Sequence, residues 1–168
     1  MALDIYSLII YPIIFILPAW IANGTPVIFG GVGVPLDFNK KLGGKPIFGR
    51  HKTLRGTASG ILGGLIMTAI MYVFISYPPA LGAALTIGAI AGDLAGSFIK
   101  RRLGIKEGRS VPIMDQYSFF VFALLFALPY LGSFPGYIGL LFITILTGVL
   151  HKLTNVLAHM ARVKKVPW

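Results

Sequence analysis

The sequence predicts an all-α integral membrane protein, a bundle of five transmembrane helices that forms a single domain over residues 1–168. Of its 168 residues, 56% are hydrophobic and 12% are charged, whereas soluble domains carry about 25% charged residues. The mean hydropathy is +0.83. Residues 56–92 and residues 116–150 contain no Asp, Glu, Lys, Arg or His, and each window is longer than the ~20 apolar residues that cross a bilayer. The composition therefore excludes an ordinary soluble domain.

Prolines divide each charge-free window into two spans. Pro78 and Pro79 interrupt the first window, and Pro129 and Pro135 interrupt the second, which predicts two helical hairpins with short, uncharged turns. The apolar segment at the amino terminus lacks the basic region of a signal peptide, so it is predicted to be a retained first helix. We expect the five spans at about residues 3–22, 57–76, 79–100, 113–131 and 135–157.

The basic residues fall into three clusters that predict the orientation. Six lie within residues 40–55, five within 100–109 and four within 152–165. With five spans, all three clusters lie on one side of the membrane, which the positive-inside rule assigns to the cytoplasm. The amino terminus is then outside, and the carboxyl terminus and the loops of residues 23–56 and 101–112 are cytoplasmic. We expect a multi-pass protein of the cell membrane, whose net charge of +10 reflects topology and not nucleic-acid binding.

Small residues recur at every fourth position in the second and third predicted spans. Such stripes allow membrane helices to approach closely, so we expect these two spans to pack against each other through them. The residues are Gly56, Gly60 and Gly64 in the second span, and Ala84, Gly88, Gly92 and Gly96 in the third.

The carboxylates are the strongest functional signal. Only five acidic residues occur in the chain, and Asp93 lies inside the third span, eight residues before Arg101, or about 12 Å from that end of the helix. An ionisable group at such a depth predicts a functional site. Ser97 and Lys100 follow on the same helical face, and Asp115 begins the fourth span at the same membrane face.

Two interpretations of these carboxylates remain open. Asp93 can form an ion pair with Lys100 or Arg101 that stabilises the bundle. Alternatively, Asp93 and Asp115 can bind Mg²⁺, which prefers one or two carboxylates together with substrate phosphates and water, while neighbouring basic residues bind further phosphate oxygens. The chain has no cysteine and only three histidines, which argues against zinc.

A series of short motifs extends this pattern. The segment Ser97-Phe98-Ile99-Lys100-Arg101 is followed by Lys106-Glu107, Pro112 and Asp115-Gln116, and Lys52-Thr53-Leu54-Arg55-Gly56 precedes them. The series resembles the signature of the membrane CTP:phosphatidate cytidylyltransferases, with its Lys-Thr-x-x-Gly, Ser-x-x-Lys-Arg, Lys-Asp and final Asp-Arg elements. It departs from the bacterial signature at Glu107 and Gln116, and residues 111–114 stand where that signature has His-Gly-Gly. Residues 22–27 and 35–37, and the chain length, are more similar to the short archaeal branch, the CDP-archaeol synthases.

The resemblance implies an activity and a set of site residues. A member of this branch is a CTP-dependent nucleotidyltransferase that transfers CMP to the phosphate of an isoprenoid ether glycerol-1-phosphate lipid and releases pyrophosphate. Its partners would be CTP, the polyisoprenoid ether lipid phosphate and the bilayer, and its cofactor Mg²⁺. Asp93 and Asp115 would bind the metal and, with Lys100, form the catalytic group. The substrate-binding residues would be Lys52, Thr53, Arg55, Ser97, Arg101, Lys106 and Glu107.

Several alternatives compete with this interpretation. The lipid can instead be an ester, as in phosphatidate. A small transporter or channel is disfavoured because the carboxylates gather at one membrane face and the sequence shows no inverted repeat. A non-catalytic scaffold would use its basic loops to bind anionic lipid. A CDP-alcohol phosphotransferase would need aspartates in a D-G-x-x-A-R pattern, which the sequence lacks.

Overall fold

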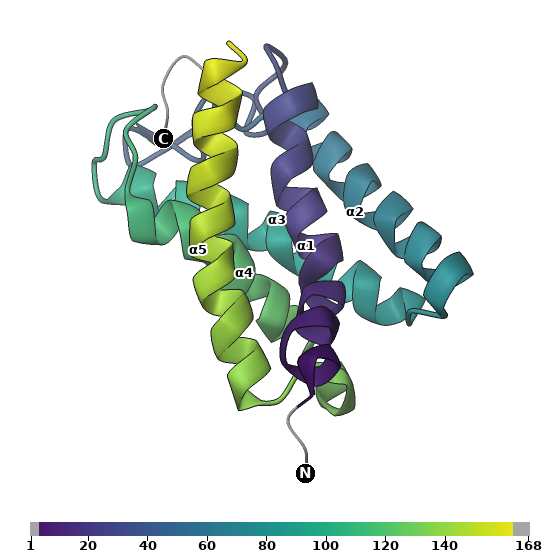
Figure 1. Cartoon of the computed structure of the whole chain (residues 1–168). Helices are drawn as coiled ribbons and strands as arrows, with labels where there is room; N and C mark the ends of the chain where they lie inside the picture. Colours follow the sequence, from purple (N-terminus) through teal and green to yellow (C-terminus); the bar gives the residue numbers. More distant parts are fainter. Residues whose placement is uncertain (1–3, 163–168) are drawn as a thin grey trace.

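The computed structural model describes residues 4–162 and is mostly helical (Figure 1). Leu3 of the predicted first span, and Lys164 and Lys165 of the third basic cluster, lie outside the described residues. The α-helices are α1 (Tyr11–Phe29), α2 (Leu54–Ile75), α3 (Pro79–Arg102), α4 (Pro112–Phe126) and α5 (Tyr137–Met160). A π-helical turn, η1 (Tyr6–Ile10), precedes α1, a 3-10 segment, η2 (Leu128–Ser133), follows α4, and two short strands, β1 (Lys41–Leu42) and β2 (Lys45–Pro46), form an antiparallel hairpin.

Four of the helical segments are long and apolar enough to cross a membrane. These are Tyr6–Phe29, Leu54–Ile75, Pro79–Arg102 and Tyr137–Met160. Helix α4 is apolar but has only 15 residues, which span about 22 Å of a hydrocarbon layer about 30 Å thick. The predicted all-α membrane architecture is therefore confirmed, whereas the fifth crossing and the orientation of the termini stay predictions.

The first helix ends later than its predicted span of residues 3–22. It continues to Phe29 through Pro26, so the first loop begins at Gly30 and not at residue 23. Two hydrogen bonds stabilise the end of the helix. The Thr25 hydroxyl donates to the Ile21 carbonyl, and the Gly30 N–H donates to the Pro26 carbonyl at 2.8 Å. Pro26 costs one helical hydrogen bond, but this last turn packs on α2 at Gly56 and Gly60.

The glycine stripes pack differently from the prediction. A Cβ added at Gly60 would lie 2.7 Å from the Ala22 carbonyl oxygen of α1 and 2.6 Å from Ile90 of α3. The α2 stripe therefore packs against both α1 and α3. A Cβ at Gly92 would lie 2.3 Å from the Ser118 carbonyl oxygen of α4. The α3 stripe therefore faces α4, and the expectation that the two stripes pack against each other is wrong for the third span. The most extensive helix contacts are those of α3 with α4 and of α1 with α2.

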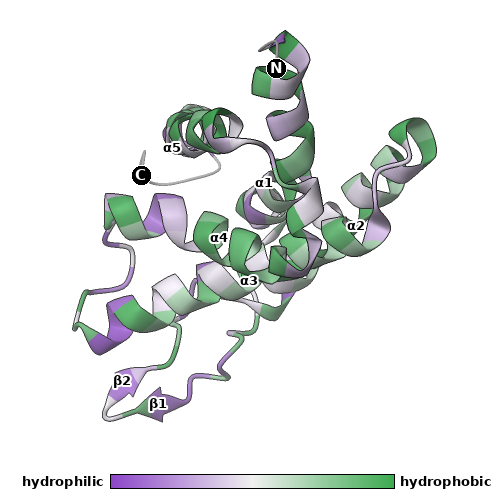
Figure 2. Ribbon diagram, turned by 90° about the horizontal axis from the view of Figure 1, so that it is seen from below, coloured by the Kyte–Doolittle hydropathy of each residue, from purple (hydrophilic) through white to green (hydrophobic). Residues whose placement is uncertain are grey.

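The helices bring the polar loops to one end of the bundle. The loop from residue 30 to residue 53 and the loop from residue 103 to residue 111 lie together beside the end of α3 (Figure 1). The hydrophilic residues gather at the β1–β2 hairpin and at the neighbouring ends of α3 and α4, while α2 and α5 are largely hydrophobic (Figure 2). The core of the bundle contains the fully buried side chains of Phe15, Ile16, Leu81, Leu85 and Ile143.

Candidate functional site: two carboxylate–lysine pairs at the end of the bundle

The first pair joins the loop of residues 30–53 to the middle of α3. Thr53 caps α2, because its hydroxyl oxygen accepts the Gly56 N–H at 3.0 Å, and this cap fixes Lys52 just outside the helix. The Lys52 ammonium lies 2.7 and 2.5 Å from the two carboxylate oxygens of Asp93. Asp93 thus pairs with Lys52, and not with Lys100 or Arg101 as the ion-pair interpretation expected.

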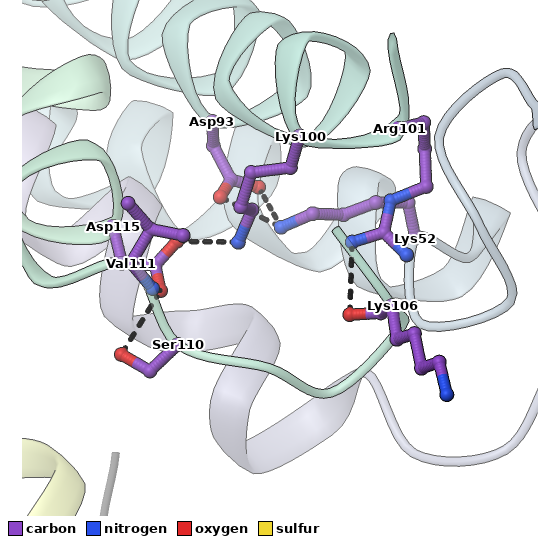
Figure 3. A network of polar contacts seen from close by, with 8 residues as sticks. All are labelled: Lys52, Asp93, Lys100, Arg101, Lys106, Ser110, Val111 and Asp115. Atoms are coloured by element: carbon purple, nitrogen blue, oxygen red, sulfur yellow. Dashed lines mark hydrogen bonds and ion pairs between the residues drawn. The ribbon is translucent and has the colours of Figure 1, made fainter. Parts of the chain in front are cut away.

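The second pair joins α3 to α4. Lys100 lies two turns after Asp93 on α3, and its ammonium donates to one carboxylate oxygen of Asp115 (Figure 3). The other oxygen of Asp115 accepts the Val111 N–H at 2.9 Å and the Ser110 hydroxyl at 3.3 Å. Asp115 therefore holds the first turn of α4 while it faces Lys100, so its orientation is fixed from both sides.

The balance of charge makes this cluster suited to an anionic ligand. Lys52 and Lys100 neutralise Asp93 and Asp115, and the buried guanidinium of Arg101 lies beside them with one donor, Nη2, 3.5 Å from the Lys106 carbonyl oxygen (Figure 3). Its Nε has no hydrogen-bond partner among residues 4–162. A buried donor without a partner costs free energy, and a phosphate oxygen is an acceptor that matches a guanidinium.

Two hollows lie near the Lys52–Asp93 pair. A cavity of about 100 Å³ is lined by Lys52, Thr53 and Asp93. A cleft of about 890 Å³ lies next to it over the loop, and Gly31 and His51 line both. The cleft alone has the size of a small-molecule site, and the cavity beside it reaches Asp93.

The other predicted site residues lie around this centre. Thr53 caps α2 and lines the cavity, Ser97 is buried on α3, and Arg55 is exposed in the first turn of α2. The Lys106 side chain points away from Asp93 and Asp115 (Figure 3). Glu107 lines the large cleft, where it accepts the Arg50 N–H at 3.3 Å. The structure therefore brings Lys52, Asp93, Lys100 and Asp115 together and leaves Lys106 outside the cluster.

Two charged residues of this region were missed by the sequence interpretation. Asp37 is buried and accepts the N–H groups of Asn39, Phe48 and Gly49 at 3.0, 2.9 and 3.2 Å. Burial raises the pKa of Asp37, but these hydrogen bonds outweigh it and the pKa lies below its usual value. Arg102 binds the hairpin. A Gly-Gly turn at residues 43–44 is the signal that predicts a hairpin there.

The donors for a cation are few. Within residues 4–162 no group of three or more His, Asp or Glu side chains gathers into a metal site. A cation held by Asp93 and Asp115 would need further oxygens from a ligand or water, which is the usual arrangement for Mg²⁺ and not for a closed structural site.

Comparisons with known proteins identify the family of this chain. A family model described as CarS-like, CDP-archaeol synthase, matches residues 5–168. The chain belongs to this family. It is 44% identical to the CDP-archaeol synthase of Methanopyrus kandleri over 92% of this chain and 90% of that one, and 43% identical to that of Pyrococcus abyssi over 92% and 95%. The CDP-archaeol synthase of Methanococcus aeolicus is 38% identical over 99% of this chain and all of that one.

A solved structure gives the same fold. It is described as an intramembrane enzyme for archaeal membrane lipids biosynthesis, and it matches with a TM-score of 0.76 and 33% identity, over 86% of this chain and 92% of that one. The family and this neighbour together make the chain a multi-pass membrane enzyme, a CTP-dependent lipid cytidylyltransferase.

Proposed function

We propose that this enzyme transfers CMP from CTP to the phosphate of an isoprenoid ether glycerol-1-phosphate lipid, giving a CDP-archaeol lipid and pyrophosphate. The observation that carries the proposal is the pair of carboxylate–lysine contacts, Lys52 with Asp93 and Lys100 with Asp115, at the polar end of a membrane bundle. The relatives that match over nearly the whole chain are named for this product.

CTP would bind with its triphosphate at the cluster. The cavity beside Lys52 and Asp93 shares Gly31 and His51 with the large cleft, so the phosphates would lie toward Lys52 while the nucleoside stays in the cleft. Lys52, Lys100 and Arg101 then offset phosphate charge. Most of the work in such a transfer is positioning and charge neutralisation, and these three cations come from two different chain segments that the fold holds in place.

Mg²⁺ fits this site. Asp93 and Asp115 are the two carboxylates that would hold it, in the pattern of few protein oxygens plus phosphate oxygens that Mg²⁺ prefers. Each carboxylate is paired with a lysine in this structure, so the lysines would turn from the carboxylates to the phosphates when the nucleotide and the cation enter together. The cation would supply neutralisation of charge on the triphosphate.

The lipid phosphate is the nucleophile in this proposal. One of its oxygens forms a bond to the α-phosphorus of CTP, the bond between that phosphorus and the bridging oxygen to the β-phosphate breaks, and pyrophosphate leaves with the electron pair. A phosphate monoester has a second pKa of about 6, so it is mostly a dianion at neutral pH and needs no strong general base. Lys100 and Asp115 lie where α3 meets α4, and they would align the two phosphates.

The location at the end of the bundle supports a reaction at the membrane surface. Helices α2 and α5 expose many large apolar side chains, among them Ile66, Phe74, Leu141 and Ile145, as expected for contact with lipid. The positive-inside rule then places the cluster and the loops at the cytoplasmic face of the cell membrane, with α4 as a fifth crossing and the amino terminus outside.

The proposal is tested by following label from CTP into lipid. Protein in detergent micelles receives CTP labelled in the cytidine, Mg²⁺, and either an unsaturated ether glycerol-1-phosphate lipid or phosphatidate. We expect label in the ether lipid, and loss of labelling in Asp93→Asn with its unfolding temperature unchanged. Arg109→Gln, which removes a charge from the exposed loop nearby, is the control and should turn over normally. Preferential labelling of phosphatidate would make an ester lipid, and not the ether lipid, the substrate. No label in either lipid would refute the proposal.

A further inference from the structure

Arg102 is a charged residue that lies outside the motifs of the sequence and ends α3. Its guanidinium donates to backbone carbonyls on both strands of the β1–β2 hairpin. Nη1 reaches the Leu42 oxygen, and Nη2 reaches the oxygens of Pro46 and, at 3.2 Å, of Lys45. The Lys45 ammonium donates in return to the Arg102 carbonyl oxygen at 2.9 Å. The hairpin and the end of α3 are therefore joined by reciprocal contacts.

Two aromatic rings complete this contact. The Arg102 guanidinium carbon lies 5.2 Å from the centre of the Phe98 ring, one turn earlier on α3, within the range of a cation–π contact. The Phe98 ring meets Phe48, just beyond the hairpin, edge-on at 6.5 Å between centres. A planar, forked guanidinium can stack on a ring while its separate nitrogens donate to carbonyls on both strands, whereas the compact ammonium of lysine has no planar fork to stack.

The hairpin forms a wall of the large cleft. Lys41, Gly44 and Pro46 of the hairpin line it, and Glu107 lines it from the α3–α4 loop. Within the loop, Asp37 binds the backbone at Phe48 and Gly49, so the segment after the hairpin is fixed to the segment before it. Arg102 fixes that assembly to α3. Lys52 follows Gly49 a few residues later in the chain.

We propose that Arg102 is a positioning residue, which clamps the hairpin to α3 and so sets the shape of the cleft that receives the nucleotide. The clamp itself stands on the contacts above, and its effect on CTP rests on the proposed function. Arg102 acts through the hairpin and takes no part in the chemistry. If the freed hairpin stays docked only about one tenth of the time, the apparent affinity for CTP falls about tenfold, while kcat at saturation changes little.

The clamp is tested first without turnover, by amide hydrogen exchange on the full chain in detergent micelles. Arg102→Gln should raise exchange at the hairpin amides, including the Ile47 N–H that donates to Lys40 at 3.2 Å, while α1 and α3 exchange as before. Arg109→Gln should change neither. Unchanged exchange at the hairpin in Arg102→Gln would overturn the proposal. This result is independent of catalysis, so an inactive wild type would count against the proposed function alone.

Kinetics and a tether then test the effect on CTP. We expect KM for CTP to rise about tenfold in Arg102→Gln and less in Arg102→Lys, with kcat nearly unchanged. The chain has no cysteine, so Leu42→Cys and Leu103→Cys in the Arg102→Gln background can be joined by a short bismaleimide. Joining them should restore the low KM. An unchanged KM, or kcat and unfolding temperature falling together without rescue by the tether, would contradict a positioning role.

Discussion

Gly92→Ala probes how the packing of α3 on α4 sets the site. The added Cβ would lie 2.3 Å from the Ser118 carbonyl oxygen and 2.8 Å from the Phe119 Cα, where ordinary contact begins at 3.4 Å. Both atoms belong to the backbone, so α3 and α4 must separate by about 1 Å, or their backbones must distort. Either change costs roughly 1–3 kcal/mol. Gly92 adjoins Asp93, and Ser118 lies one turn beyond Asp115. A displacement of about 1 Å between catalytic groups lowers turnover about 100-fold.

The assay compares labelled CTP turnover and unfolding temperature in micelles. Gly92→Ala should lose about two orders of magnitude in turnover and unfold at a lower temperature. Gly24→Ala on α1 is the matched control. A Cβ at Gly24 meets nothing within 4 Å, and alanine is a better helix former than glycine. Normal turnover in Gly92→Ala at a normal unfolding temperature would refute the argument that the α3–α4 spacing sets the site.

Three further predictions concern Lys52, Asp37 and the cation. Lys52→Gln should raise KM for CTP about 10- to 100-fold, since hydrogen bonds to charged groups contribute about 1.5–3 kcal/mol; a KM within twofold of wild type would contradict the assignment. Asp37→Asn should raise exchange at the Phe48 and Gly49 amides. The pKa of Asp37 lies below its usual value of 3.8, so wild type keeps this protection at pH 3.8 and above. The protection is lost as the pH falls through the lowered pKa and the carboxylate is protonated; protection independent of pH would contradict this account. Chelation should abolish turnover and added Mg²⁺ should restore it; turnover that survives chelation would exclude the cation.

The membrane architecture followed from the sequence because hydrophobicity acts over whole segments. The charge-free windows and their prolines predict the hairpins of α2 with α3 and of α4 with α5, and the structure has helices at these places. The end of α1 was misjudged because Asn23, Gly24 and Pro26 read as a loop by local propensity. Packing of that turn on the glycines of α2 favours the helix instead. Tertiary contact overrode propensity there.

Asp93 and Asp115 could be singled out from the sequence because a carboxylate near a membrane span is costly. The lysines that pair with these two carboxylates could not be identified from the sequence. Asp93 meets Lys52, which is 41 positions away in the chain, and helical spacing indicates only neighbours on the same helix. The role of Arg102 was equally hidden, because its acceptors are backbone carbonyls, and these exist in any sequence. Only the folded hairpin directs them toward α3.

The central claim is that Asp93 and Asp115 act together on one nucleotide. The measurement that tests it most directly is labelled CTP transfer to lipid by wild type, Asp93→Asn, Asp115→Asn and the double variant, each checked for folding. Groups that act as a unit are strongly non-additive. We predict that each single variant loses at least about 100-fold in turnover and that the double variant is no slower than the slower single one. Losses that multiply in the double variant, or one silent single variant, would contradict a shared site.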